Sequence, residues 1–365
     1  MHHPLQVLKH YWGYDGFRPG QAEVIDSILS GHDTLALMPT GGGKSITFQV
    51  PALANSGICL VISPLVALMK DQVKNLQKRG ILSAFISSEM PHWEILQQLD
   101  NCILGDYKFL YISPERISSE LFQEKLKTLS RKVNLLVVDE AHCISQWGND
   151  FRRDYRLIAD IRDAIPHVQV IAVTASATAA VVADICEQLH FRKGYRIFKT
   201  SFERKNLSFV VRKTDNKLKE ICHILSAVPG SAVIYSRTRK GVEEYAGKLR
   251  AAGISAEYFH AGLDPVLKTE RQADWVKGFT RVLVATNAFG MGIDKGDVRV
   301  VIHTEFPDSM EAYYQEAGRA GRDGKRAYAV ALLGPQDITD IKRRPSNAFP
   351  TIEYIKRVYE ALCNR

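Results

Sequence analysis

Short apolar runs that alternate with amphipathic stretches constrain the fold of this chain more than any other feature. A strand that is buried on both faces forms a continuous apolar run, whereas a covering helix has apolar residues at three- and four-residue spacing. The runs in the first half lie at residues 34–38, 58–63, 109–113, 135–138 and 169–173. Because capped, amphipathic sequence follows each of them, the alternation predicts an α/β fold in which helices cover a mostly parallel sheet.

The same alternation begins again in the second half of the chain. A charged and poorly periodic stretch at residues 200–217 precedes further apolar runs at residues 232–235, 256–259, 281–285, 298–303 and 328–333. The 365 residues exceed the about 100 to 200 residues of an ordinary domain. The sequence therefore predicts two α/β lobes joined by a hinge, followed by a short helical extension at the C-terminus.

A glycine-rich loop follows the first predicted strand, where residues 38–45 read Met-Pro-Thr-Gly-Gly-Gly-Lys-Ser. Such glycines let backbone N–H groups face one phosphate group, while the next helix turns its positive end toward that anion. Lys44 would reach the β and γ phosphates, and Ser45 would place its hydroxyl on Mg²⁺. Met38 stands where the strict pattern has glycine. The residues predicted to bind the phosphates are Thr40, Gly41, Gly42, Gly43, Lys44 and Ser45.

A pair of carboxylates follows another predicted strand. Asp139, directly after residues 134–138, would hold the metal ion, and Glu140 would orient or deprotonate water. Either feature alone is often structural, because glycine-rich turns and solvated acidic pairs occur in many proteins. Both together, each at a strand end, predict a catalytic site for a nucleoside triphosphate and Mg²⁺, with Lys44, Asp139 and Glu140 as catalytic residues.

Most other distinctive clusters also fall at the ends of predicted strands. In open α/β sheets, ligand groups gather at the carboxyl ends of the strands. The further clusters are residues 63–65, 113–116, 174–177, 236–238 and 286–292. This placement predicts that the functional groups of each lobe share one edge of its sheet.

Charge and cysteine content limit the partners and the cellular compartment that the sequence predicts. A net charge of +8 favours a polyanionic partner without naming one. The six cysteines include no Cys-x-x-Cys pair, which argues against a zinc ribbon and against a disulfide framework. The sequence has no N-terminal signal core and no run near the roughly 18 apolar residues of a membrane span. We therefore expect an intracellular protein without a zinc site or a membrane partner.

A series of further motifs follows in order along the chain. They are residues 17–21 (FRPGQ), 63–72 (SPLVALMKDQ), 174–178, 285–295 and 313–324 (YYQEAGRAGRDG). Residues 142–152 (HCISQWGNDFR) add an aromatic-rich loop directly after the carboxylate pair. Together these segments resemble superfamily-two helicases with a DEAH-type box. Through the aromatic-rich loop they most closely resemble RecQ-type DNA helicases, from about residue 14 to about residue 334.

The resemblance implies two tandem RecA-like lobes. The ATP-binding lobe would occupy residues 1–205, the helicase C-terminal lobe residues 206–337, and the start of a helical module residues 338–365. It also implies an ATP- and Mg²⁺-dependent 3′ to 5′ DNA helicase that acts in DNA repair and recombination. Its expected partners are single-stranded DNA, forked or tailed duplexes and DNA-repair proteins. The expected location is the bacterial cytoplasm or nucleoid, or the eukaryotic nucleus.

The segment ahead of the P-loop is expected to recognise ATP. The Gln21 amide can pair with a donor and an acceptor of adenine, and the Tyr14 ring can stack on the base. Arg18 belongs to the same segment. Tyr14 and Phe17 could instead only staple the start of a helix, but the resemblance favours ATP.

Arg319 and Arg322 lie three positions apart in the lobe without the P-loop, on one face if their segment is helical. The resemblance assigns both to the γ-phosphate in the transition state, with Arg322 preferred as the arginine finger. Such a residue raises the rate by about 10³ to 10⁵. Surface salt bridges are the structural alternative.

The aromatic-rich loop is expected to couple nucleic acid to hydrolysis. A base stacked on Trp147 could shift Glu140, because both lie in one short segment. Burial of Trp147 in the core is the alternative. The residues predicted to bind or sense the strand are Ser63, Lys70, Gln146, Trp147, Phe151, Arg152 and Asn287, several of them through phosphates.

Departures from the family pattern leave alternatives open. Asn149 replaces the usual His and Arg153 the usual Pro, and residues 338–365 contain only Cys363 where many relatives begin a four-cysteine zinc module. An RNA helicase of the same superfamily remains an alternative, because phosphate contacts are shared by both nucleic acids. A nucleic-acid scaffold with a vestigial ATP site and a metabolic P-loop ATPase are weaker alternatives, since neither explains the motifs of both lobes.

Overall fold

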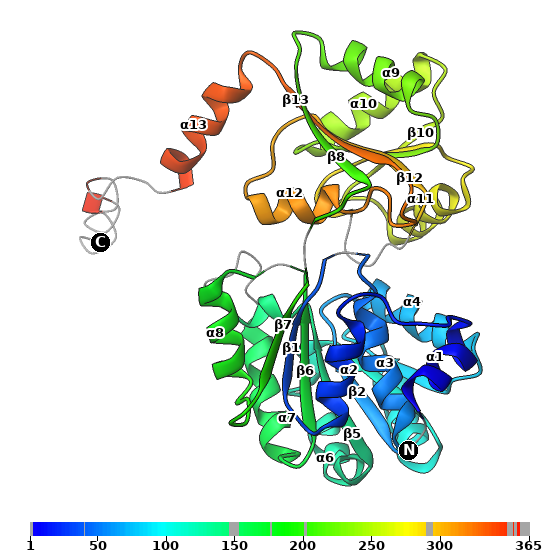
Figure 1. Cartoon of the computed structure of the whole chain (residues 1–365). Helices are drawn as coiled ribbons and strands as arrows, with labels where there is room; N and C mark the ends of the chain where they lie inside the picture. Colours follow the sequence, from blue (N-terminus) through cyan, green and yellow to red (C-terminus); the bar gives the residue numbers. More distant parts are fainter. Residues whose placement is uncertain are drawn as a thin grey trace. The chain divides into compact units, whose positions relative to one another are not determined.

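The computed structural model describes residues 3–39, 41–145, 153–175, 177–200, 203–289 and 295–348, together with Glu353, Lys356 and Arg357. Among these residues, contacts divide the chain into two compact units, the first ending at Glu203 and the second beginning at Arg204. Each unit holds one β-sheet with its own helices (Figure 1). No helix in the described ranges combines the length and the apolar character needed to cross a membrane.

The strands of the first unit are β1 (Thr34–Leu37), β2 (Ile58–Ile62), β3 (Ser83–Ile86), β4 (Phe109–Ile112), β5 (Val133–Asp139), β6 (Gln169–Thr174) and β7 (Arg196–Lys199). They form a seven-stranded sheet in the order β3-β4-β2-β5-β6-β1-β7, and every ladder in it is parallel. Each predicted apolar run of this half is confirmed as a strand. The prediction missed β3 and β7 at the two edges of the sheet, where β7 is too exposed to form an apolar run.

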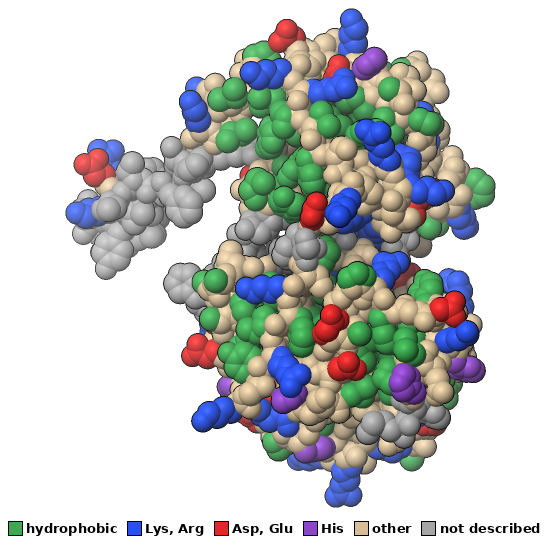
Figure 2. All heavy atoms as spheres, in the orientation of Figure 1, with side chains coloured by type: hydrophobic (Ala, Val, Ile, Leu, Met, Phe, Trp, Pro, Cys, Tyr) green, Lys and Arg blue, Asp and Glu red, His purple; other side chains and the backbone are tan. Residues whose placement is uncertain are grey.

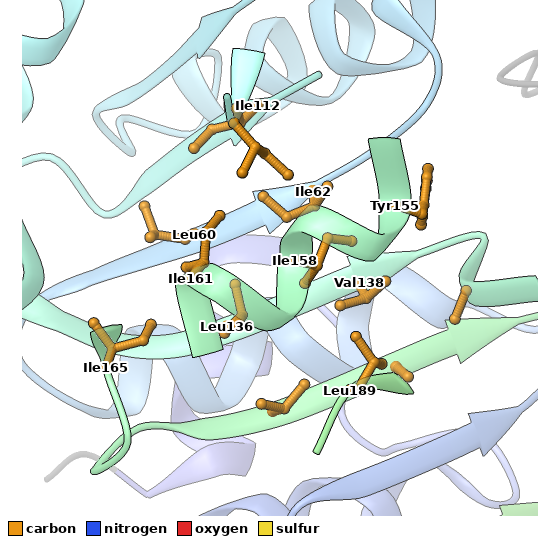
Figure 3. Close-up of a cluster of buried hydrophobic side chains, with 14 of the residues drawn as sticks. Leu60, Ile62, Ile112, Leu136, Val138, Tyr155, Ile158, Ile161, Ile165 and Leu189 are labelled. Carbon is orange, nitrogen blue, oxygen red and sulfur yellow. The ribbon is translucent and has the colours of Figure 1, made fainter. Parts of the chain in front are cut away.

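The helices of the first unit are α1 (Pro4–Trp12), α2 (Gln21–Leu29), α3 (Lys44–Ala54), α4 (Val66–Gln77), α5 (His92–Leu104), α6 (Glu120–Leu129), α7 (Ile158–Ala164) and α8 (Ala179–Gln188). Apolar residues of α1 to α4 pack with Val61 and Val137 on one face of the sheet. Those of α5 to α8 pack with Leu60 and Leu136 on the other face, where Ile158 and Ile161 lie over these strands (Figure 3). Successive strand residues point to opposite faces, so apolar side chains at every position fill both layers.

The strands of the second unit are β8 (Leu207–Lys213), β9 (Ser231–Tyr235), β10 (Ala256–Phe259), β11 (Val282–Ala285), β12 (Val298–His303) and β13 (Ala327–Leu333). They form a six-stranded parallel sheet in the order β10-β11-β9-β12-β13-β8. Its helices are α9 (Lys217–Ala227), α10 (Arg239–Ala251), α11 (Pro265–Lys277), α12 (Met310–Ala317) and α13 (Asp337–Ala348). Helices α9 and α10 pack on one face of the sheet, and α13 supplies the predicted C-terminal helix.

The predicted hinge at residues 200–217 was wrong in one respect, because it contains strand β8. β8 pairs with β13 along its whole length and forms an edge of the sheet. Most of its side chains are at least partly exposed, and its apolar residues are interrupted by Ser208 and followed by two charged residues. The ladder of main-chain hydrogen bonds to β13 defines this strand. With this exception, the predicted fold class of two parallel-sheet lobes covered by helices is confirmed.

Candidate active site

Strand order brings the predicted motifs of the first unit together. β5 lies between β2 and β6, and β1 lies on the other side of β6. Because all four strands are parallel, the segments that follow them meet at the same edge of the sheet. Ser63, Asp139 and Thr174 therefore lie beside the P-loop, which follows β1.

The P-loop has the backbone that its glycines permit. Gly43 has φ 77°, in the left-handed region, and caps α3 directly before Lys44. A Cβ on Gly42 would lie 2.9 Å from the Pro39 carbonyl oxygen. Met38 belongs to the buried core instead, and its N–H donates to the Thr174 carbonyl at 3.0 Å. The position that departs from the strict pattern thus serves packing. Thr40 lies outside the described residues.

The segment predicted to read adenine braces the P-loop. The Arg18 N–H donates to Gln21 Oε1 at 2.9 Å, and Gln21 Nε2 donates to the Gly43 carbonyl at 3.0 Å. Arg18 Nη1 donates to the Gly41 carbonyl at 2.8 Å. Gln21 is only 3% exposed, whereas Tyr14 is 53% exposed. Bracing of the loop is a role that sequence reasoning missed, and binding of the base by these side chains stays a prediction.

The two carboxylates lie against the lysine of the P-loop. Lys44 Nζ is 3.5 Å from Glu140 Oε1. Asp139 accepts hydrogen bonds from the Glu140 N–H at 3.0 Å and from the Ser63 hydroxyl at 3.3 Å. Burial, reinforced by the negative charge of Glu140 and opposed by Lys44, raises the pKa of Asp139 to about 6. The site therefore holds a carboxylate whose negative charge would be stabilised by an added cation.

Glu140 adopts an unusual backbone conformation. Its φ of 47° and ψ of 48° lie in the left-handed region, which costs a residue with a side chain free energy. His142 follows on a short 3₁₀ helix (Ala141–Ile144), and its Nδ1 lies 2.9 Å from Thr174 Oγ1 and 3.4 Å from Glu140 Oε2. His142, which itself contacts Thr174 of β6, thus lies beside the carboxylate predicted to act on water.

A tyrosine of the core is hydrogen-bonded to the main chain of the segment that carries the two carboxylates. The Tyr155 hydroxyl donates to the Asp139 carbonyl at 2.9 Å, and its ring is fully buried in the cluster that contains Ile158 and Val138 (Figure 3). The main chain of Asp139 is thereby tied to the core. Sequence reasoning missed Tyr155, because a single core tyrosine carries no motif. It placed Thr174 in the motif at residues 174–178 but did not assign it this contact with His142.

The donor set of this edge fits Mg²⁺. Ser45 and Asp139 offer hydroxyl and carboxylate oxygens, the ligand type that this ion prefers. In the described part of the chain, no group of three or more His, Cys, Asp and Glu residues could hold a metal ion by itself. This agrees with Mg²⁺ in phosphoryl-transfer sites, where one or two protein oxygens and the phosphates of the substrate share the ion.

The residues predicted to contact nucleic acid differ in their exposure, and several lie outside the described residues. Ser63 is buried beside Asp139, and Lys70 forms a half-exposed ion pair with Glu89 at 3.2 Å. Asn287 is exposed near the end of β11. Gln146, Trp147, Phe151 and Arg152 lie outside the described residues, as does the departure at Asn149. On the face of each unit that Figure 2 shows, Lys and Arg are interspersed with Asp and Glu.

In the second unit, the predicted arginine pair lies on a turn. α12 ends at Ala317, so the two guanidiniums do not share a helix face as the helical interpretation required. Arg319 is only 6% exposed and lies near Tyr235, where its charge opposes the rise that burial gives the Tyr235 pKa, to about 12. Arg322 retains more exposed surface.

Two family models match the chain. One, described as DEAD/DEAH box helicase, matches residues 18–185, and the other, described as helicase conserved C-terminal domain, matches residues 216–324. The matches include the P-loop, the carboxylate pair and the arginine turn. Together with the two parallel sheets, they define the class of this protein as a superfamily-two helicase with two RecA-like units.

Curated relatives narrow this class. The ATP-dependent DNA helicase RecQ of Bacillus subtilis is 43% identical over 93% of this chain and 57% of the relative. The probable ATP-dependent DNA helicase RecS of the same organism is 39% identical over 91% of this chain and 67% of the relative. The chain belongs to the RecQ-type helicases. It spans about half the length of the first RecQ relatives, between 52% and 57%.

One further relative has a different description. It is named putative ATP-dependent RNA helicase R290, from Acanthamoeba polyphaga mimivirus, and is 40% identical over 93% of this chain and 62% of its own length.

Solved structures share the fold at low sequence identity. The Mycobacterium smegmatis helicase Lhr bound to ssDNA and AMP-PNP has a TM-score of 0.73 and 20% identity, over 93% of this chain and 49% of that one. The Saccharomyces cerevisiae protein Dbp5 bound to RNA and ADP BeF3 has a TM-score of 0.71 and 17% identity, over 95% and 92%. These likenesses establish the fold alone.

Proposed function

We propose that this chain is the motor part of an ATP-dependent DNA helicase that moves 3′ to 5′ along single-stranded DNA and separates duplexes during DNA repair and recombination. Membership of the RecQ-type helicases supports the substrate class. The observation that carries the activity is the meeting of Lys44, Asp139 and Glu140 at the carboxyl edge of one sheet. Residues 1–205 would form the ATP-binding lobe, residues 206–337 the C-terminal helicase lobe, and residues 338–365 the start of a helical module.

Each residue of the P-loop edge has a separate role in this proposal. Thr40, Lys44 and the three glycines bind the phosphates, while Ser45 and Asp139 hold Mg²⁺, which neutralises negative charge on the phosphates when bound. Glu140 orients the attacking water and accepts its proton. Tyr14, Arg18 and Gln21 recognise adenine.

The ion pair between Lys44 and Glu140 explains how phosphate binding prepares the base. At 3.5 Å, the lysine partly neutralises the carboxylate. A phosphate that attracts the Lys44 ammonium competes with Glu140 for the same charge. The carboxylate is then available to accept a hydrogen bond from water, so binding of the substrate switches the base on.

The second unit supplies charge to the transition state. Arg322 is the proposed finger because it is less buried than Arg319, which lies beside Tyr235. Ser63, Lys70, Gln146, Trp147, Phe151, Arg152 and Asn287 are the proposed nucleic-acid and coupling residues. The proposed partners are single-stranded, forked or tailed DNA and DNA-repair proteins. The proposed location is an intracellular compartment that holds DNA.

A nucleotide turnover assay tests the motor. Lys44→Ala should abolish the ATP hydrolysis that single-stranded DNA stimulates, because its ammonium contacts the phosphates. Lys248→Ala is a matched control, since Lys248 forms an exposed ion pair with Glu244 on α10 and should leave turnover unchanged. Undiminished turnover by Lys44→Ala would contradict the assignment of the site.

The mimivirus relative makes RNA the competing substrate. Turnover should be measured against matched single-stranded DNA and RNA, followed by strand displacement from duplexes with a 3′ or a 5′ tail. The proposal expects stimulation by DNA and displacement only from the 3′-tailed duplex. Equal or greater stimulation by RNA would favour the RNA helicase, and displacement from the 5′ tail would reverse the polarity.

A further inference from the structure

The turn that carries the two arginines is held by a residue far away in the sequence. Arg204 Nη2 donates to the carbonyls of Ala320 at 3.0 Å and Gly321 at 2.6 Å, and Nη1 lies 3.5 Å from the Gly318 carbonyl oxygen. These carbonyls belong to the residues before and between Arg319 and Arg322. One half-buried guanidinium therefore fixes the main chain from which both predicted transition-state groups extend.

Asn206 completes the hold on this turn. Its Nδ2 donates to the carbonyls of Gly321 and Lys325, both at 2.8 Å, and its Oδ1 accepts from Arg204 Nε at 3.3 Å. Its main-chain carbonyl accepts from the Ala327 N–H at 2.9 Å. Arg204 and Asn206, which we call the turn clamp, thus bind the turn at both ends.

Gly321 shows how closely the turn is packed against the turn clamp. Its φ of 63° is left-handed, and its N–H donates to the Val298 carbonyl at 2.9 Å. A Cβ at this position would lie 2.6 Å from Asn206 Nδ2 and 2.8 Å from the Ala327 Cβ. The main chain of the turn has no room to shift toward the clamp, so its path is determined by these contacts.

The Arg204 guanidinium is partly withdrawn from water. Desolvation lowers the pKa of its guanidinium, and carbonyl acceptors offset the lost hydration. A guanidinium has donors in a fixed planar fork, which suits several carbonyls of one turn and which a lysine cannot reproduce.

We propose that Arg204 and Asn206 are positioning residues for the arginine finger, which orient Arg319 and Arg322 through the main chain of the turn. This inference rests on the proposed function. Arg204 is also the first residue of the second unit.

Steady-state ATP hydrolysis by the full chain with saturating single-stranded DNA tests the proposal. Arg204→Ala and Asn206→Ala should each lower kcat, up to about 10²-fold, as small displacements of catalytic groups do. The KM for ATP should stay unchanged, because the residues proposed to bind the phosphates and adenine belong to the first unit. Arg204→Lys should have a higher kcat than Arg204→Ala but a lower one than the wild type, since lysine keeps the charge but makes fewer of the contacts.

Arg281→Ala is the matched control. The Arg281 guanidinium also donates to main-chain carbonyls of the second unit, those of Gly230, Leu225 and Val228, but at a different turn. It should lower thermal stability without changing kcat. An equal loss of kcat in Arg281→Ala and Arg204→Ala, at equal loss of stability, would show that the turn clamp is merely structural and overturn the proposal. Should Arg204→Ala fail to fold, Asn206→Ala and Arg204→Lys carry the same test.

A double-variant comparison separates this inference from the function on which it rests. In an Arg319→Ala, Arg322→Ala background, Arg204→Ala should lower kcat no further, because there is no guanidinium left to position. A full additional loss of kcat there would overturn the proposal. If the background variant itself hydrolyses ATP like the wild type, the proposed arginine finger fails. If that variant is impaired while Arg204→Ala keeps the wild-type kcat, only the positioning role fails.

Discussion

Two aspartates at opposite edges of the first sheet show how differently the same side chain is used. Asp33 directly precedes β1 and is 1% exposed. Its carboxylate contacts Arg162 Nη2 and Arg192 Nη2, both at 3.0 Å, and accepts from the N–H groups of Val170 and Arg192 at 2.9 Å and 2.8 Å. Asp139, at the carboxyl end of β5, accepts from one hydroxyl and one N–H group.

The difference lies in how each negative charge is compensated. Two guanidiniums balance Asp33 inside the protein, so that carboxylate is complete without a ligand. Around Asp139, burial and Glu140 disfavour the charged form, even though the residue keeps some exposed surface. The first arrangement serves stability. In the proposed function, the second holds a negative charge ready for a cation that arrives with the substrate, at a cost to the stability of the folded protein.

Removing the charge of Asp139 is the strongest test of the difference between Asp33 and Asp139. Asp139→Asn should lower ATP turnover about 10³-fold, or about 4 kcal/mol, because the proposed metal site loses its carboxylate. Steady-state hydrolysis with Mg²⁺ and single-stranded DNA measures this. Asp106→Asn is the control, since the Asp106 side chain is highly exposed and forms a surface ion pair with Lys108. Turnover within a few-fold of wild type would remove Asp139 from the site.

The same substitution at the other edge should act on stability. Asp33→Asn leaves Arg162 and Arg192 without their shared anion, and breaking such a buried pair costs about 3 kcal/mol or more of unfolding free energy. Urea unfolding measures the change, with Asp163→Asn as an exposed control. Turnover per folded molecule should stay unchanged. A small stability effect would mean that Asp33 is not the structural counterpart of Asp139.

The pH dependence of stability sharpens the comparison further. The folded-state pKa of Asp139 lies near 6, above its ordinary value of 3.8. A carboxyl with a raised folded pKa destabilises the folded state above that pKa, and the cost vanishes as pH falls below the unfolded value. In metal-free buffer at pH 8, Asp139→Asn should therefore be more stable than wild type, on the order of 1–2 kcal/mol. The gap should close between pH 6 and pH 4, and a constant gap would contradict the shift.

Ser63→Ala is expected to have the smallest effect. It removes one hydrogen bond to Asp139, which is worth about 1 kcal/mol. Because that bond lowers the Asp139 pKa, its loss should raise this pKa further and shift the acidic limb of ATP turnover to higher pH. A pH–rate profile checks the direction. An unchanged limb would contradict an effect of the Ser63 hydroxyl on the Asp139 pKa.

Sequence reasoning succeeded where residue type itself carries the signal. Buried parallel strands are apolar at every position, so β2 and β5 were recognisable, and P-loop chemistry requires Gly43 and Lys44 near one another. It failed where the partner is the main chain. β8 is defined by its ladder to β13, and Arg204 and Asn206 act on carbonyls that every residue possesses. Asp33 was missed for a related reason, because its arginines lie more than a hundred residues away.

The hydrogen bonds of Gln21 connect the predicted adenine site with the loop predicted to bind the phosphates. Gln21 has a single amide, which already serves the Arg18 N–H and the Gly43 carbonyl. Its Nε2 also lies 3.4 Å from the Gly42 carbonyl oxygen. An adenine that accepts a hydrogen bond from Nε2, as the proposed function requires, would therefore compete with these two carbonyls, and such a linkage is reciprocal. Under the proposed function, base recognition would therefore alter the contacts of the loop that receives the phosphates. Bare tripolyphosphate has no purine that could compete for the Gln21 amide, so it should bind a P-loop whose contacts with Gln21 are intact, unlike the loop that ATP binds.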